Sequence, residues 1–169
     1  WGGILGGWLG GVLYAKYSGA SVGKLMDIAA PAMFVAQTIG RVGDVINGEH
    51  WSRALDTFWG WYFTHPDSPA RIGAERFFGD PERPVHPAIV YEMIWNMIGL
   101  YVITKLRGRL TPDGSIWWVY LTWYSIGRFF IQFLRLDDVK FLGLQEAHII
   151  AILVLSVSLP YIFKKVRVK

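Results

Sequence analysis

Long stretches without any charged residue divide this sequence into apolar segments separated by short charged clusters. The clearest of them are residues 28–40, 93–104, 115–127 and 149–163. A helix needs roughly 20 mainly apolar residues to cross about 30 Å of hydrocarbon, and these stretches approach that length. The chain also has nine Trp and eight Tyr among 169 residues, and both residue types favour the membrane interface. We therefore predict an all-α fold, a polytopic transmembrane helix bundle.

The apolar pattern predicts about five membrane spans in this chain. Their ranges are 1–17, 25–43, 87–105, 115–135 and 144–163. Because Trp1 already lies inside an apolar Gly-rich run, we expect the chain to be a piece of a longer protein. Glycines recur at every fourth position of the first span, and Ala32, Ala36 and Gly40 repeat this spacing in the second. Small residues at this spacing allow helices to approach closely, so we expect both spans to pack against protein.

The distribution of charge predicts how these spans are oriented. One set of span ends carries nine basic residues against only Asp27 and Asp113: Lys16, Lys24, Lys105, Arg107, Arg109, Lys164, Lys165, Arg167 and Lys169. Basic residues in short loops are retained in the cytoplasm, so these ends and the C-terminus are predicted to be cytoplasmic. The long segment 41–86 has five Arg and seven acidic residues and is predicted to face outward. Within it, residues 44–86 are expected to form a small irregular extracytoplasmic cap.

Composition also limits which partners and cofactors this chain could use. The net charge of +4 comes from basic residues at the ends of apolar runs, not from one continuous stripe, so we predict no nucleic-acid partner. The absence of cysteine excludes disulfides, thiolate metal sites and a cysteine nucleophile in this chain. The four His lack a metal-ligand spacing. We therefore expect neither a metal nor a cofactor.

Polar residues inside the predicted spans gather near their outward ends. They are Gln37 and Arg41, Glu92 and Asn96, Arg128 and Gln132, and Gln145, Glu146 and His148. Such residues are costly in a membrane, and their position is therefore informative. Arg128 lies deepest, where it could bind a ligand, reach up to the interface, or form a structural ion pair with Glu92. Glu92 and Asn96 could equally be site residues or contacts that hold the bundle together.

The densest group of polar residues is at 40–51. Arg41, Asp44, Asn47 and Glu49 are interleaved with three glycines where a predicted span leaves the membrane. Arg41 and Arg128 are expected at the same depth on different helices, and guanidinium groups bind phosphate with paired hydrogen bonds. In the outer leaflet, the abundant phosphates belong to lipids. The pattern therefore predicts a phospholipid-binding site.

Three stretches, taken together and in order, resemble the prolipoprotein diacylglyceryl transferase family. They read GRVGDVINGE at 40–49, HPAIVYE at 86–92 and YSIGRFFIQFLR at 124–135. The resemblance implies an enzyme of the bacterial plasma (inner) membrane, with its active site toward the outer leaflet. It moves the diacylglyceryl group of phosphatidylglycerol onto the lipobox cysteine of a secreted prolipoprotein. Because that thiol belongs to the substrate, the absence of cysteine here is expected.

The resemblance also implies roles for individual residues. Arg41 and Arg128 would hold and neutralise the lipid phosphate, and Glu49 would be an essential carboxylate. Glu49 or His86 would accept the thiol proton. Further expected contributors to substrate binding are Gly2, Asp44, Asn47, Tyr124 and Gln132.

Two other functions are compatible with the same residues. A transporter or channel subunit would also bury charges, but its polar residues would continue into the cytoplasmic half, where the predicted spans are nearly apolar. A catalytically degenerate lipid-binding scaffold is the second alternative. It is suggested by Asp44 where the family usually has Asn, Gln132 where Glu is frequent, and Trp1 where many members have His.

Overall fold

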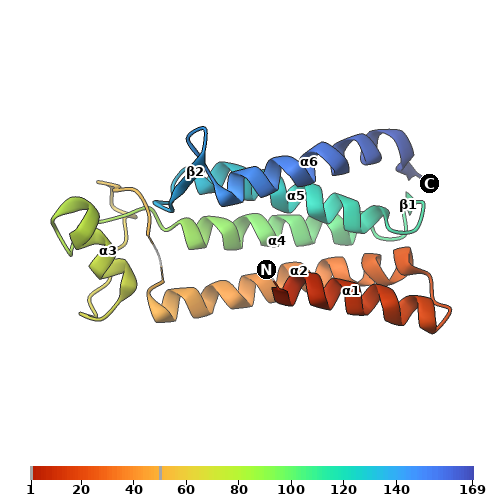
Figure 1. Ribbon diagram of the computed structural model, residues 1–169, viewed down its shortest axis with the longest axis horizontal. Helices are drawn as coiled ribbons and strands as arrows, with labels where there is room; N and C mark the ends of the chain where they lie inside the picture. Colours follow the sequence, from red (N-terminus) through yellow and green to blue (C-terminus); the bar gives the residue numbers. More distant parts are fainter. Residues whose placement is uncertain (1, 50) are drawn as a thin grey trace.

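The computed structural model describes the backbone of residues 2–49 and 51–169, and the side chains of residues 6–49 and 51–169. The long helices are α1 (Gly2–Tyr17), α2 (Val22–Asn47), α4 (Ala88–Leu106), α5 (Ser115–Gln132) and α6 (Glu146–Lys165). The shorter elements are α3 (Pro69–Phe78), β1 (Leu110–Thr111), β2 (Val139–Phe141), β3 (Leu144–Gln145) and β4 (Arg167–Val168). The long helices run along one axis, and α3 lies beyond one end of them (Figure 1).

The prediction of a mainly helical fold is confirmed, and a helix occupies each of the five predicted ranges. Within the described residues, only α4 and α6 are long and apolar enough to cross a membrane by length and composition. Only 17% of the apolar stretch of α6 is buried inside the protein. A core helix of a soluble protein would be mostly buried. The exposed apolar surface of α6 therefore agrees with a membrane environment.

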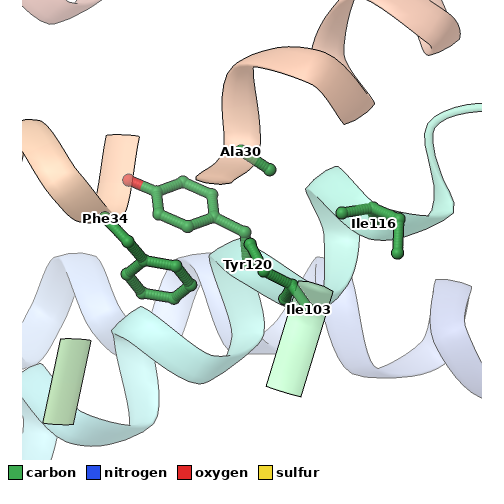
Figure 2. Packing of buried hydrophobic residues seen from close by; sticks show 5 residues of the cluster. All are labelled: Ala30, Phe34, Ile103, Ile116 and Tyr120. Carbon is green, nitrogen blue, oxygen red and sulfur yellow. The ribbon is translucent and has the colours of Figure 1, made fainter. Parts of the chain in front are cut away.

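The apolar core lies where α2, α4 and α5 meet, toward the end of the bundle remote from α3. Its fully buried members are Ala30, Phe34, Ile103, Ile116 and Tyr120 (Figure 2). The rings of Phe34 and Tyr120 pack edge to face, with centroids 4.8 Å apart. This end of the bundle is therefore closed by apolar side chains.

Two tryptophans fix the position of α4 against α5. The indole N–H of Trp95 donates to the carbonyl of Trp123, and that of Trp123 donates to the carbonyl of Trp95. Glycines make room for these rings: a Cβ at Gly127 would lie 2.1 Å from Nε1 of Trp95, and one at Gly99 would lie 2.6 Å from the Trp123 ring. Gly99 and Gly127 therefore allow α4 and α5 to pack closely.

Within the described residues the small-residue ridges of α1 and α2 are open, so their expected packing against protein stays a prediction. A Cβ at any of Gly6, Gly7, Gly10 or Gly11 would have no other atom within 4 Å. Ala32, Ala36 and Gly40 are exposed as well. Among the described residues, α1 packs mainly against α2.

The segment between α2 and α4 differs from the expected irregular cap in two ways. Helix α2 continues beyond the predicted limit at residue 43 and ends at Asn47, because Gly48 adopts a left-handed conformation with φ of 65°. The segment also contains the helix α3, which starts with Pro69 in its first turn and ends at Gly79. We call residues 48–87 the cap segment.

Backbone pairing attaches the cap segment to the end of α5. The amide of Arg53 donates to the carbonyl of Leu134, and the amide of Leu136 donates to that of Trp51. Because residues 133–136 form these bonds, α5 ends at Gln132 and not at residue 135 as predicted. The β2–β3 hairpin that follows was not predicted from the sequence.

The opposite end of the bundle carries the nine basic residues that the sequence placed at one set of span ends. The α1–α2 connection and the C-terminus both lie at this end, away from α3 (Figure 1). Strand β4 at the C-terminus pairs with β1 between α4 and α5. Asp27 of α2 accepts hydrogen bonds from the amides of Gly114 and Trp117 at the start of α5. The protein is therefore polarised, with basic loops at one end and the cap segment at the other.

Candidate functional site

One buried carboxylate joins the two arginines that the sequence singled out. Glu92 on α4 is 4% exposed and forms ion pairs with Arg41 of α2 and Arg128 of α5. Its Oε2 lies 2.5 Å from Nη2 of Arg41, and its Oε1 contacts Nη1 of Arg128. The expectation that Arg41 and Arg128 lie close together near one end of the bundle therefore agrees with the structure.

A second carboxylate compensates the charge of this cluster. Asp44 lies one turn after Arg41 on α2, and its Oδ2 is 2.5 Å from Nη1 of Arg41. Both terminal nitrogens of Arg41 thus face carboxylates, whereas Arg128 shares only the carboxylate of Glu92 among the ion pairs of the described residues. The two guanidinium charges are balanced by two carboxylates. The site is therefore held together without a bound anion.

An open cavity of about 220 Å³ adjoins this cluster. Its walls are Gln37, Gly40, Arg41, Asp44, Asn96 and Tyr124. Tyr124 stacks on Tyr120, whose hydroxyl accepts a hydrogen bond from Gln37. Neither Arg128 nor Glu92 is among the lining residues, and Arg128 is connected to the cavity wall through Glu92, which contacts Arg41. The cavity therefore combines one guanidinium, amide groups and an aromatic surface, which suits a polar headgroup attached to an apolar body.

Gln132 lies in a separate polar cluster beside the cavity. Its amide nitrogen donates to Asp137, at 2.6 Å, and to Gln145 at the start of α6. Arg135 also binds Asp137, with Nε 3.1 Å from Oδ2. Burial alone would raise the pKa of Asp137, but the charge of Arg135 and these hydrogen bonds outweigh it and place the pKa below its ordinary value. Through these hydrogen bonds, Gln132 connects the β2–β3 hairpin to the end of α5.

Asn47 and Glu49 lie at the end of α2, beyond Asp44. The amide of Asn47 donates to the carboxylate of Glu49 at 3.4 Å, and the backbone N–H of Glu49 bonds to the carbonyl of Asp44. Both side chains are exposed, and neither lines the cavity. They therefore form a rim at the end of α2.

His86 stands at the end of the cap segment, just before α4. Its Nδ1 lies 3.5 Å from the hydroxyl of Tyr91, and it does not line the cavity. Burial lowers the pKa of His86 below its ordinary value, so the ring is neutral at pH 7. Gly2 lies at the start of α1. The surroundings of Gly2 and the structure of Trp1 lie outside the described residues.

The sequence prediction did not assign Glu92, Gln37 or Asn96 to the site. The signal for the first and last of these was present, because Glu92 and Asn96 are spaced i, i+4 in an otherwise apolar helix and so share one face. The sequence alone did not show which face met the arginines. No group of three or more potential metal-ligating His, Asp or Glu occurs in the part of the chain that the structure describes.

Comparison with known proteins decides the family. The prolipoprotein diacylglyceryl transferase family profile matches residues 1–164. The chain belongs to the prolipoprotein diacylglyceryl transferase family. The resemblance inferred from the three motifs is thereby confirmed, and family membership agrees with the membrane-compatible helices α4 and α6.

Curated relatives support the same assignment. Phosphatidylglycerol--prolipoprotein diacylglyceryl transferase from Lysinibacillus sphaericus (strain C3-41) is 32% identical over 99% of this chain and 61% of its own length. Proteins of the same name from Bacillus cereus (strain G9842) and Bacillus mycoides (strain KBAB4) are each 33% identical over 95% of the chain and 58% of theirs. The chain thus spans about three fifths of the length of the curated relatives it matches.

Proposed function

We propose that the protein containing this chain transfers the diacylglyceryl group of phosphatidylglycerol to the cysteine thiol of bacterial prolipoproteins. The observation that carries this proposal is the joining of Arg41 and Arg128, from separate helices, by one buried carboxylate beside an open cavity. Guanidinium groups bind phosphate with paired hydrogen bonds. The family match and the names of the curated relatives support the choice of reaction.

The reaction is a displacement at the glyceryl carbon that carries the phosphate. The substrate's sulfur forms a bond to that carbon, the carbon–oxygen bond breaks, and glycerol phosphate leaves with the electron pair. Negative charge therefore grows on the leaving phosphate, and prepositioned arginines stabilise it. In this proposal Arg41 and Arg128 have this role, while Asp44, Asn47, Tyr124, Gln132 and Gly2 contribute to the binding site.

The thiol must lose its proton, because thiolate is the nucleophile. Glu49 and His86 are the proposed acceptors. Glu49 is exposed at the rim formed by the end of α2, and His86 is neutral at pH 7 and can therefore take up a proton. The two can be separated by the pH profile of transfer. A general base makes the transfer rate fall at low pH. If this fall disappears in His86→Gln but not in Glu49→Gln, His86 accepts the thiol proton, and the reverse result assigns this role to Glu49.

We further propose that all five long helices cross the bacterial plasma membrane, with the cap segment outside and the C-terminus in the cytoplasm. The basic loops gathered at one end of the bundle support this orientation (Figure 1). Because the chain has no cysteine, single-cysteine variants can map it. An impermeant thiol reagent added to intact spheroplasts should label Asp67→Cys in the cap segment and leave Arg107→Cys unlabelled. Labelling of Arg107→Cys alone would reverse the orientation.

Transfer of labelled diacylglyceryl from phosphatidylglycerol to a lipobox peptide tests the reaction. The full-length protein should be active, and Arg41→Ala and Arg128→Ala should each reduce the rate at least 100-fold, in the range expected for losing one oxyanion donor. Arg83→Ala is the matched control, because Arg83 pairs with Asp56 in the cap segment. Full activity in both Arg41→Ala and Arg128→Ala would refute the proposal.

The alternatives predict different results in the same experiment. A degenerate scaffold would bind phosphatidylglycerol without transferring its diacylglyceryl group, and the neutralisation of Arg41 by Asp44 is the observation that favours it. A transporter would need polar residues through both halves of the bundle. Instead, an apolar cluster of Ala30, Phe34, Ile103, Ile116 and Tyr120 lies in the half remote from the cap segment.

A further inference from the structure

Glu92 is the only carboxylate of the described residues that contacts both arginines of the site. It comes from α4, between the helices that carry Arg41 and Arg128, and each of its oxygens serves one guanidinium group. We propose that Glu92 is a positioning residue that sets the spacing of the Arg41 and Arg128 guanidinium groups for a lipid phosphodiester. This inference rests on the proposed function and assigns a role to a residue that the sequence motifs left open.

Glu92 reduces the repulsion between the positive charges of Arg41 and Arg128. Two guanidinium groups in a low-dielectric site repel each other and would otherwise separate toward solvent. A carboxylate between them offsets this repulsion and holds both at the distance set by its two oxygens. A phosphodiester also presents two anionic oxygens on one atom. A pair of arginines ordered by a carboxylate is therefore close to the arrangement that such a phosphate requires.

The arginines keep unused donors while they contact Glu92. A guanidinium group has five N–H donors, and Glu92 faces only one terminal nitrogen of each arginine. Arg41 also lines the open cavity. A phosphate entering there meets the N–H donors that Arg41 does not use for Asp44 and Glu92, so Glu92 need not be displaced.

The position of Glu92 is itself fixed by packing. It lies one turn before Trp95, whose indole forms the reciprocal hydrogen bonds with Trp123 on α5. Arg128 follows Trp123 on that same helix. Glu92 and Arg128 therefore belong to one tightly held helix pair, whereas Arg41 on α2 is brought to this pair by the carboxylate.

The competing explanation is that Glu92 only neutralises buried charge and stabilises the bundle. Geometry and charge can be separated with two variants. Glu92→Asp keeps the charge but is one methylene shorter, so it cannot hold both guanidinium groups at the same spacing. Glu92→Gln keeps the length but loses the charge.

The test uses the full-length protein in nanodiscs, with kcat and KM for phosphatidylglycerol as readouts. We expect Glu92→Asp to fold with nearly wild-type thermal stability and to lose about 100-fold in kcat/KM, a loss typical of misplacement by about 1 Å. Glu92→Gln should lose at least as much. Thr122→Val is the matched control, because it removes a buried hydrogen bond to Ser158 between α5 and α6 in the same bundle.

A binding measurement provides a readout other than activity. The melting temperature of wild type and of Thr122→Val should be higher in phosphatidylglycerol than in phosphatidylcholine. For Glu92→Asp this difference should be much smaller. Wild-type kcat/KM and lipid response in Glu92→Asp would overturn the positioning role, as would tighter lipid binding by Glu92→Gln. If Arg41→Ala and Arg128→Ala stay active, the proposed function fails; if they lose activity while Glu92→Asp does not, only this inference fails.

Discussion

Trp95 and Trp123 each donate the indole N–H to the other's backbone carbonyl, with N–O distances of 2.8 and 3.0 Å, and their rings stack with centroids 4.6 Å apart. An exchange of this kind satisfies two polar groups that would otherwise be costly in an apolar environment. It also fixes α4 and α5 in a single register. Because Glu92 and Arg128 lie on these two helices, the tryptophan pair determines whether they meet.

Replacing Gly127 with Ala should disturb this register. The added Cβ would lie 2.1 Å from Nε1 of Trp95, and the ring cannot yield without breaking its hydrogen bond. Overpacking of this kind costs about 1 to 3 kcal/mol. We expect a lower melting temperature and, because Glu92 moves relative to Arg128, a lower transfer rate for the folded enzyme.

Trp95→Phe should also lower the melting temperature and the transfer rate, because it removes one of the two indole donors. Trp118→Phe is a matched control on α5, where Trp118 stacks on Tyr161 and a phenyl ring can replace the indole. Thermal unfolding followed by intrinsic fluorescence, together with the transfer assay, measures both effects. A melting temperature for Gly127→Ala at or above that of wild type would contradict the packing argument.

Asp44→Asn should strengthen binding of the lipid phosphate. The carboxylate of Asp44 lies 2.5 Å from Nη1 of Arg41 and competes with any anion for that donor. An amide of the same size keeps a hydrogen-bond acceptor but leaves the site with one more net positive charge. If one charge-assisted bond of about 1.5 to 3 kcal/mol is partly recovered, KM for phosphatidylglycerol should fall by roughly ten-fold.

Asp56→Asn controls for a general change in protein charge, because Asp56 pairs with Arg83 in the cap segment, away from the cavity. The KM of this control should equal that of wild type. An unchanged or increased KM in Asp44→Asn would mean that Asp44 holds Arg41 in its productive position instead of competing with the lipid.

The pKa of Asp137 predicts how one part of the stability depends on pH. Its pKa in the folded protein lies below the ordinary value. The charged form therefore stabilises the fold at any pH above the ordinary pKa of about 3.9, and this contribution is lost as the pH falls through the lower, folded-state pKa. Asp137→Asn should lower the melting temperature at pH 7, and the difference from wild type should shrink as the pH falls below 4.

Asp138→Asn is the control for Asp137→Asn, because Asp138 is exposed next to it. Melting curves between pH 3 and 7 measure the effect in both variants. If the difference between wild type and Asp137→Asn is the same at pH 3 and pH 7, the charge of Asp137 does not hold the hairpin to α5.

The long helices and the proximity of the arginines followed from local sequence patterns. Charge-free runs of this length indicate membrane helices because a helix satisfies its backbone polar groups within its own segment. Arg41 and Arg128 were predicted at one level because both lie in the outward halves of their predicted spans. Both inferences depend only on distances along one helix.

Contacts between helices could not be predicted in the same way. Nothing in the spacing of Glu92 and Asn96 tells which neighbour their shared face meets. The glycine ridges of α1 had the spacing of a helix interface, yet among the described glycines of the long helices it is Gly127 and Gly99 that face aromatic rings. The end of α5 was misplaced for a similar reason, since residues 133–136 leave the helix to pair with the cap segment, a contact between residues about 80 positions apart.

Asp27 should contribute to stability without contributing to the chemistry. Its two oxygens accept hydrogen bonds from the amides of Gly114 and Trp117, at 2.8 and 3.0 Å, and so cap the start of α5 from a different helix. Removing such a cap costs about 0.5 to 2 kcal/mol. Asp27→Ala should therefore lower the melting temperature while the folded fraction retains its kcat and KM, because the cap lies at the end of the bundle remote from Arg41.

The exposed Asp113, whose Oδ2 is 4.0 Å from Nζ of Lys24, offers the control Asp113→Ala. Equal losses of stability in the two variants would show that negative charge at this end matters more than the two hydrogen bonds.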